Sequence, residues 1–304
     1  MTVLEVRGIS KSFDGVQAVR DVSFAVNRGE ILGFLGPNGA GKTTTIRMII
    51  GIIQPDRGEI EFTLDGGSGE VDKERIGYLP EERGLYADAK VLDTLVYLAG
   101  LKGLSRSEAR RRALSWLERF DLAEWAKRKI EQLSKGMQQK VQFTAAIIHR
   151  PDLLVLDEPF SGLDPVNQDL FKEIIRELRD DGVAILLSSH QMNRVEELCD
   201  RIFLIHCGRR VLYGDLSEIK EAHGEHIVRL RYAGDVSSLS PNQRIKDLRI
   251  SGDWATFVLA KGVEPDAFIR SIPRGLVIRE IAVGRPPLHD IFVAVVKGGE
   301  NDTP

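Results

Sequence analysis

The chain has 304 residues, of which 42% are hydrophobic and 29% are charged, a composition that fits one large globular domain and a small one. Its formal net charge is −3, so no overall basic field points to nucleic acid, and its two cysteines are too few for a disulfide framework and indicate reduced thiols in the cytosol. No apolar run approaches the ~20 residues of a membrane-spanning helix, and the first residues lack a signal-peptide pattern. Any role at a membrane therefore has to come from docking onto a partner.

The first fifty residues predict strands followed by a helix. Alternation of apolar and polar residues predicts short strands at Leu4–Arg7, Ser12–Phe13 and Val22–Val26, and the apolar run Ile31–Leu35 predicts a buried strand. The amphipathic segment Thr43–Ile53 then predicts a helix that Gln54-Pro55 ends.

A glycine-rich turn joins that buried strand to that helix. It consists of Gly36, Pro37, Asn38, Gly39, Ala40, Gly41, Lys42, Thr43 and Thr44, which fit the phosphate-loop pattern G-x-x-x-x-G-K-[ST]. Glycines let backbone N–H groups curl around phosphate oxygens, and the following helix points its positive end at the anion. Lys42 is then expected to reach the β- and γ-phosphates, and the Thr43 hydroxyl to bind Mg²⁺.

Residues from about 88 to 150 have helical periodicity, and a helical subdomain is expected at about 82–150. Leu92, Leu95 and Val96 fall on one helix face. Basic residues cluster here at Arg106, Arg110, Arg111, Arg112, Arg119, Lys127, Arg128 and Lys129. Acidic residues are interleaved with them, which favours a solvated helix surface over a nucleic-acid patch.

The apolar strand Leu153–Leu156 is followed by two carboxylates, Asp157 and Glu158. Two acids at the end of a buried strand indicate a functional role, because burial of a charged group without a partner is costly. Asp157 suits the Mg²⁺ shell, and Glu158 is placed to polarise an attacking water as a general base. A helix from Val166 to Arg179 and a strand from Val183 to Leu187 follow, and strand–helix–strand order with apolar strands implies a parallel sheet.

A second, small α+β domain is expected at residues 223–297, after a first domain at 1–222 and before a frayed tail at 298–304. Its expected strands are Ile227–Tyr232, Ile245–Ile250, Ala255–Leu259 and Val277–Val283, with a helix around Asp266–Ile272.

With the phosphate loop and the acidic strand end in place, the chain resembles the ABC ATPase family. Leu133-Ser-Lys-Gly-Met137 occupies the place of the LSGGQ signature, in which Ser134 and Gly136 are implied to cap the γ-phosphate bound by the other subunit. Ser161–Asp164 resembles the D-loop, and His190, in Ser188-Ser-His190, resembles the switch histidine that holds Glu158 and the water. The resemblance implies a P-loop α/β core of mostly parallel sheet with an N-terminal antiparallel subdomain.

Four further positions follow from the same resemblance. Phe13 resembles the aromatic residue that stacks on adenine, although taken alone it would more often be a core residue. Glu81 stands at the glutamine of the Q-loop, where a carboxylate could bind Mg²⁺ through a water and raise the pKa of Glu158. Lys135 and Met137 replace the usual Gly and Gln of the signature, which leaves Ser134 and Gly136 for phosphate capping.

The subtype resembles the ATPase subunits of ABC-2 type exporters, through Tyr78–Tyr86, Leu133–Lys140 and Leu288–Phe292. ATP and Mg²⁺ are the implied cofactors. The implied partners are a transmembrane permease and a second ATPase subunit, identical or not, with no nucleic acid and with the membrane reached only through the permease, at its cytoplasmic face. The segment Glu81–Leu98 is expected to form the groove for the permease.

Soluble ABC ATPases outside transport are the alternative. A chromosome-maintenance ATPase would carry a long coiled coil between Lys42 and Asp157, and a translation factor would carry two cassettes. A non-catalytic binding module is disfavoured by the intact Lys42, Asp157, Glu158 and His190.

Overall fold

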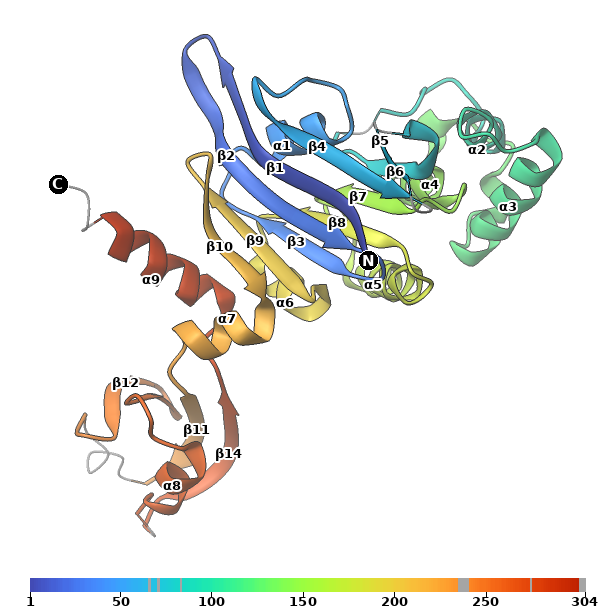
Figure 1. The fold of residues 1–304 in the computed structure, drawn as a ribbon. Helices are drawn as coiled ribbons and strands as arrows, with labels where there is room; N and C mark the ends of the chain where they lie inside the picture. Colours follow the sequence, from blue (N-terminus) through green and yellow to red (C-terminus); the bar gives the residue numbers. More distant parts are fainter. Residues whose placement is uncertain (65–66, 70–71, 83, 235–240, 274, 301–304) are drawn as a thin grey trace. The chain divides into compact units, whose positions relative to one another are not determined.

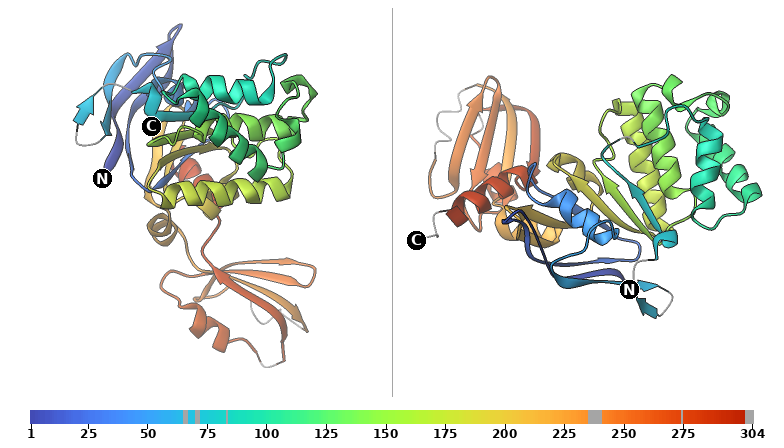
Figure 2. Two further views of the ribbon diagram at one scale, coloured as in Figure 1. Left: turned by 90° about the vertical axis from the view of Figure 1, so that its right-hand side faces the viewer. Right: turned by 90° about the horizontal axis from the view of Figure 1, so that it is seen from above.

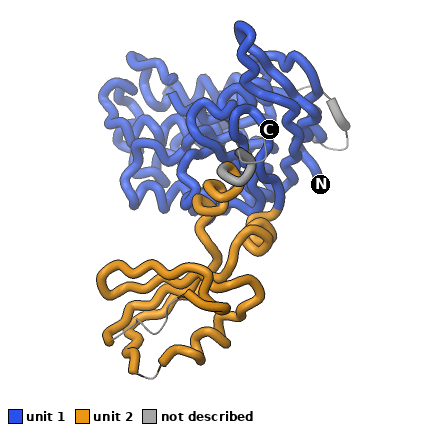
Figure 3. The backbone as a smooth tube through the Cα atoms, turned by 90° about the vertical axis from the view of Figure 1, so that its left-hand side faces the viewer, with its two compact units in different colours: residues 1–214 blue, residues 215–304 orange. Residues whose placement is uncertain are grey.

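The computed structural model describes residues 1–64, 67–69, 72–82, 84–234, 241–273 and 275–300. The chain divides into two compact units, residues 1–214 and 215–304 (Figure 3). The division falls before the boundary expected after residue 222, because helix α7 (Leu216–His223) contacts α9 (Leu288–Glu300) of the second unit. Among the described residues, no helix has the length and apolar character to cross a membrane.

The first unit contains two sheets (Figure 1). A four-stranded sheet has the order β2-β1-β4-β5, formed by β1 (Thr2–Phe13), β2 (Val16–Asn27), β4 (Arg57–Leu64) and β5 (Gly67–Gly69). A six-stranded sheet has the order β10-β9-β3-β8-β7-β6, formed by β3 (Ile31–Leu35), β6 (Ile76–Leu79), β7 (Leu153–Asp157), β8 (Ala184–Ser189), β9 (Arg201–His206) and β10 (Arg209–Asp215). Its pairs β3/β8, β3/β9, β7/β8 and β6/β7 are parallel, so the expected P-loop α/β core with an antiparallel subdomain is confirmed.

The N-terminal strands are longer than expected. Leu4–Arg7 and Ser12–Phe13 belong to the single strand β1, which pairs with β2 through several register shifts. Such bulges keep two strands paired while they interrupt the period-2 pattern, which is why the sequence shows only fragments. The two sheets enclose a shared core in which the rings of Phe24, Phe34 and Phe203 lie 5.1–5.4 Å apart between centroids.

Helix α1 (Lys42–Ile49) follows the phosphate loop and is shorter than the expected Thr43–Ile53. Gly51 adopts a left-handed φ of 69°, and its N–H bonds to the Met48 carbonyl. A left-handed glycine directly after a helix ends it by satisfying its last carbonyls. The helix therefore ends before Gln54-Pro55 is reached.

The helical subdomain consists mainly of α2 (Val91–Gly100), α3 (Arg106–Arg119) and α4 (Lys135–Ile147), which gather at one end of the first unit (Figure 2). Short 3-10 turns, Ala123–Trp125 and Ile130–Gln132, connect α3 to α4. The rings of Phe120 and Phe143 pack on Phe171, which joins this subdomain to α5 (Pro165–Asp180). Helix α6 (Met192–Leu198) follows β8.

The second unit is a small α+β domain. Its antiparallel sheet has the order β12-β13-β11-β14, formed by β11 (Ile227–Ala233), β12 (Ile245–Ser251), β13 (Trp254–Leu259) and β14 (Val277–Gly284). Helix α8 (Pro265–Arg270) places Phe268 in its core, with the Phe257 ring 5.0 Å away. Helix α9 extends to Glu300, so residues 298–300 are helical rather than a frayed tail, and 301–304 lie outside the described residues.

Candidate functional site

The phosphate loop leaves β3 through two glycines that the surrounding chain requires. A Cβ atom at Gly36 would lie 2.4 Å from the Ile205 carbonyl oxygen, and one at Gly41 would lie 2.5 Å from the Ala18 carbonyl oxygen. Gly41 also has a φ of 107°, in the region that favours glycine. It is the N-cap of α1, and no side chain among the described residues caps that helix, so its first N–H groups point into the loop as an anion site.

Lys42 is the first residue of α1 and lies over the loop. Its Nζ donates hydrogen bonds to the carbonyl oxygens of Gly36, at 2.7 Å, and of Pro37, at 3.2 Å. Burial lowers the pKa of Lys42 below its ordinary value, while the charges of Glu158, Asp157 and Glu81 act to raise it. The ammonium group is therefore the cation of a site that otherwise carries negative charge.

Asp157 ends β7 at the edge of this loop and is 2% exposed. Burial, with smaller contributions from the charges of Glu81 and Glu158, raises the pKa of Asp157 to about 6. Its Oδ2 atom has no hydrogen-bond partner in the described part of the chain. A buried carboxylate with a free oxygen, beside the Thr43 hydroxyl, is a donor set that fits the hard cation Mg²⁺.

The residues around Asp157 and Thr43 provide oxygen ligands for part of a metal's coordination shell, not for the whole of it. No group of three or more His, Cys, Asp or Glu side chains that could hold a metal ion occurs in residues that the structure describes. Mg²⁺ usually keeps waters and phosphate oxygens in its shell and takes only one or two protein ligands. Thr43 and Asp157, with Glu81 in the same pocket, fit that partial shell.

Glu158 is held by the last residue of β8 and the residue that follows it. Its Oε1 accepts a 2.7 Å hydrogen bond from the His190 backbone N–H and lies 2.7 Å from His190 Nδ1, and its Oε2 accepts one from Ser189 Oγ at 3.3 Å. A carboxylate only accepts, so the hydrogen-bond network assigns the imidazole proton to Nδ1 and leaves Nε2 free. Glu158 has a left-handed φ of 49°, an uncommon conformation for a non-glycine residue that is often found at functional sites.

One pocket collects most of the expected residues. It is lined by Ala18, Asn38, Gly39, Gly41, Lys42, Thr43, Thr44, Glu81, Asp157 and Glu158, and His190 joins it through Glu158. Ala18 and Ser189 are additions that sequence reasoning missed. Ala18 carries no chemical signal in the sequence, whereas Ser189 was visible beside His190.

Gly36, Pro37 and Ala40 of the phosphate loop do not line this pocket, and three expected residues from other segments also lie outside it. Phe13 is the last residue of β1 and is 45% exposed, with the ammonium group of Lys11 over its ring. Ser134 is the N-cap of α4, where its Oγ accepts a hydrogen bond from the Met137 N–H at 3.3 Å. A Cβ atom at Gly136 would meet nothing closer than 3.9 Å, so the fold of one chain does not require a glycine there.

A prediction follows from the buried charge of Asp157. In the absence of nucleotide and metal, Asp157→Asn should raise the melting temperature by several degrees at pH 8, because an amide avoids the cost of burying a carboxylate beside Glu81 and Glu158. The folded-state pKa of about 6 lies above the ordinary 3.8, so this cost is absent below about pH 4, grows between the two values and is complete above pH 6.

Melting curves in EDTA at pH 5 and pH 8 check this expectation. The gain should be smaller at pH 5, and Asp93→Asn, on the exposed surface of α2, serves as the control without a gain. A variant that is equally stabilised at both pH values would show that burial of the Asp157 charge is not the cause.

Together, a strand, a phosphate loop and a helix, with two carboxylates at the end of β7 in the same sheet, define a P-loop nucleotide-binding protein. A family model described as "ABC transporter" matches residues 19–161, and one described as the C-terminal domain of DrrA1-3-like ATP-binding proteins matches residues 214–296. The chain belongs to the ATP-binding proteins of ABC transporters.

Similar proteins support this membership along the chain. The uncharacterized ABC transporter ATP-binding protein YhaQ of Bacillus subtilis is 41% identical over 295 residues, which are 97% of this chain and 98% of that protein. The linearmycin resistance ATP-binding protein LnrL of the same organism is 36% identical over 76% of each chain. A solved ATP-binding subunit of an ABC transporter has a TM-score of 0.68 and 36% identity, over 72% of this chain and 92% of that one.

Proposed function

We propose that this protein is the ATP-hydrolysing subunit of an exporter, acting as a dimer at the cytoplasmic face of a membrane that a separate permease spans. One observation carries the proposal. The pocket places Lys42, Thr43, Asp157 and Glu158 around one space, with His190 bonded to Glu158.

Each residue has a role in hydrolysis that its surroundings allow. Lys42 and the N–H groups at the start of α1 bind the phosphates, and Thr43 and Asp157 hold Mg²⁺, which neutralises charge on the β- and γ-phosphates when bound. Glu158 orients the attacking water and accepts its proton. His190 Nδ1 donates to the Glu158 carboxylate, and in the imidazolium form Nε2 also carries a proton that it can donate to the γ-phosphate.

Ring stacking on adenine is assigned to Phe13 in the same proposal, and a water-mediated Mg²⁺ contact to Glu81. The exposed ring of Phe13 is available to a base, and Glu81 lines the pocket beside Asp157. Both assignments rest on the resemblance of their sequence positions to those of the family.

The second chain completes the site through Ser134 and Gly136. A single chain leaves open space at Gly136, at the positive end of α4, so the missing side chain serves an approaching group rather than the fold. A triphosphate held by one chain fits this helix start of the other. Loss of the γ-phosphate removes the anion between the two chains, so the dimer loosens.

A groove on the helical subdomain is the proposed docking site for the permease. Leu85, Leu98 and Leu101 line an apolar pocket together with Tyr78 and Ala145. Leu85 and Leu98 belong to the segment 81–98, which begins at Glu81, the residue assigned to the water-mediated Mg²⁺ contact. Binding of the permease in the groove and the nucleotide state of the site therefore act on the same segment. The name of LnrL, a resistance ATP-binding protein, favours export as the direction of transport. No observation favours the alternative of a soluble ABC ATPase outside transport.

The decisive experiment purifies the full chain with its bound membrane partner and measures Mg²⁺-dependent phosphate release. We expect co-purification of a membrane-spanning protein and ATP hydrolysis by the complex. A preparation that binds ATP but releases no phosphate, alone or with the partner, would contradict the hydrolytic role.

A groove variant tests the docking site. Leu98→Asp should greatly reduce recovery of the permease while ATP binding by the isolated chain is unchanged, because a carboxylate in an apolar interface is left without a partner. The matched control is Leu114→Asp, since Leu114 is 40% exposed on α3 of the same subdomain and does not line the groove. Equal recovery of the permease with both variants would place the docking site elsewhere.

A further inference from the structure

The first unit has a second cavity, of about 700 Å³, at the opposite edge of the six-stranded sheet. The nucleotide pocket lies where β7 ends, at Asp157, whereas this cavity lies where β7 and β8 begin, beside Asp152 and Val183. Its walls are α3 and the last turns and following residues of α4 and α5. Pockets of this size hold small organic ligands in other proteins.

Arginine dominates the walls of this cavity. Five arginines line it, Arg28, Arg111, Arg112, Arg119 and Arg150, against three acids, Asp152, Glu177 and Asp181. We call these five the arginine cluster. The acids neutralise only part of its charge, so the lining keeps an excess of two positive charges, which Glu108 of α3, paired with Arg111 and Arg112, reduces to one.

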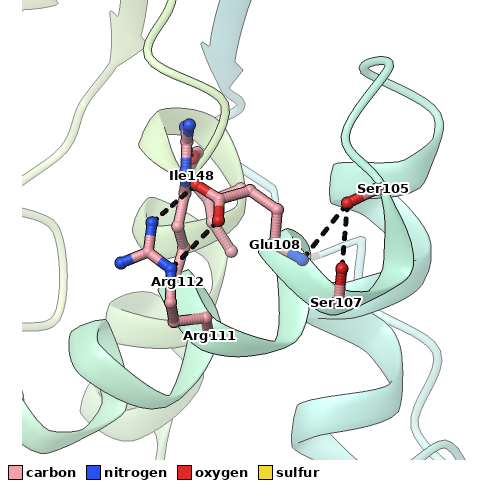
Figure 4. A network of polar contacts seen from close by, with 6 residues as sticks. All are labelled: Ser105, Ser107, Glu108, Arg111, Arg112 and Ile148. Carbon is pink, nitrogen blue, oxygen red and sulfur yellow. Dashed lines mark hydrogen bonds and ion pairs between the residues drawn. The ribbon is translucent and has the colours of Figure 1, made fainter.

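The arginine cluster is held in place by its own hydrogen bonds. Arg112 donates to Glu108 through Nε at 2.7 Å and to the Ile148 carbonyl through Nη1 at 3.0 Å (Figure 4). Arg28 and Arg119 each donate one Nη2 hydrogen bond, to Asp152 at 2.9 Å and to Glu177 at 2.6 Å. Because a guanidinium group has five N–H donors, most donors of these side chains remain for an occupant or for water.

Arg150 stands apart within the cluster. Its side chain is exposed and makes no hydrogen bond or ion pair with the part of the chain that the structure describes. It follows α4 with a left-handed φ of 60°, a conformation that residues other than glycine adopt uncommonly. An unpaired guanidinium group at the rim of a positively charged cavity is a donor set suited to phosphate oxygens.

Trp116 adds a planar apolar wall. Its ring is half-buried, packs on Phe120 with centroids 5.9 Å apart and carries the Arg119 guanidinium at 5.3 Å. The Trp116 ring and the arginine cluster together suit a ligand that has an anionic end and a less polar body. We propose that this cavity binds a phosphate-bearing anion of nucleotide size, with its phosphate on Arg150 and Arg28 and its body beside Trp116.

The helices that form the cavity also reach the proposed dimer face. Helix α4 begins after Ser134 and α5 begins after Asp164, in the segments that resemble the signature and the D-loop. Both helices end at the cavity, near Ile148 and Asp181. An occupant therefore contacts the far ends of two helices whose first turns face the second subunit in the proposed dimer.

Trp116 can report on binding directly. The sequence has three tryptophans, so the full-length protein with Trp125→Phe and Trp254→Phe keeps Trp116 as its single indole. This protein is titrated with guanosine monophosphate, with inorganic triphosphate and with a hexaglutamate peptide while its fluorescence is recorded. The first two distinguish an organic phosphate from a bare polyphosphate as the source of the phosphate, and the peptide tests for carboxylate binding.

Arg150→Glu in that background should weaken phosphate binding at least about tenfold, which is the scale of one charge-assisted hydrogen bond. The φ of Arg150 costs a glutamate as much as an arginine, so backbone strain does not change. Arg110→Glu, on the exposed surface of α3 outside the cavity, is the matched control and should bind like the parent.

Saturable binding of either phosphate probe that Arg150→Glu weakens and Arg110→Glu does not weaken would support the site. Three results would overturn it: no saturable change at Trp116, equal effects of the two variants, or tighter binding of hexaglutamate than of both phosphates. Because the readout is binding at Trp116, it is independent of ATP hydrolysis and of the permease.

Discussion

Replacement of Glu158 by glutamine is expected to abolish ATP turnover while ATP binding is retained. The amide keeps the shape of the side chain and can still accept a hydrogen bond from the His190 N–H, but it cannot take a proton from water. Removal of a general base typically costs 10²–10⁴-fold in rate, so a loss of at least about 100-fold is expected. Steady-state phosphate release and equilibrium ATP binding measure the two halves of this expectation.

The same variant should accumulate an ATP-bound dimer. If the γ-phosphate bridges two chains, a protein that cannot cleave it stays closed, and light scattering should show a dimer with Mg²⁺ and ATP but a monomer with ADP. Glu173→Gln, an equivalent change on the exposed surface of α5, should turn over normally and form no lasting dimer. Turnover by Glu158→Gln at the wild-type rate would remove Glu158 from its role.

The phosphate loop and the acidic strand end could be predicted because their signals are local. Ile31–Leu35 is apolar on both faces, Gly36 to Thr44 follow it directly, and a helix comes next. Likewise Leu153–Leu156 lead straight into Asp157 and Glu158. Each motif needs only its neighbours in the sequence, so pattern and chemistry agree before any folding is known.

The geometry that unites those motifs could not be predicted from composition or periodicity. Glu158 meets His190, 32 residues later, because β7 and β8 are parallel neighbours with Asp157 opposite Ser188. The resemblance to the family implied that His190 holds Glu158. Only the register of β7 and β8 explains why the two residues are in contact. The left-handed φ of Glu158 likewise has no signal in the sequence.

The end of α1 was predicted wrongly, because one residue ends the helix although the periodic pattern continues. The apolar pattern continues to Ile53, yet Gly51 ends α1. At the other end of the chain, a tail was expected from residue 298 because chain ends are often frayed, but α9 continues to Glu300. In the second unit, alternation found all four strands, whereas their order, with β11 between β13 and β14, depends on contacts distant in sequence.

Replacement of Lys42 by alanine, unlike Glu158→Gln, should weaken ATP binding itself. Lys42 is the buried cation beside Asp157, Glu158 and Glu81, so its removal leaves phosphates facing carboxylates without a countercharge. Hydrogen bonds to charged groups contribute about 1.5–3 kcal/mol, so ATP affinity should fall roughly 10- to 100-fold. Lys261→Ala, which changes the net charge equally on the exposed surface of the second unit, should bind ATP normally. ATP affinity within twofold of wild type in Lys42→Ala would mean that the phosphates do not lie in this loop, and the proposed site, the bridging γ-phosphate and the dimer built on it would be wrong together.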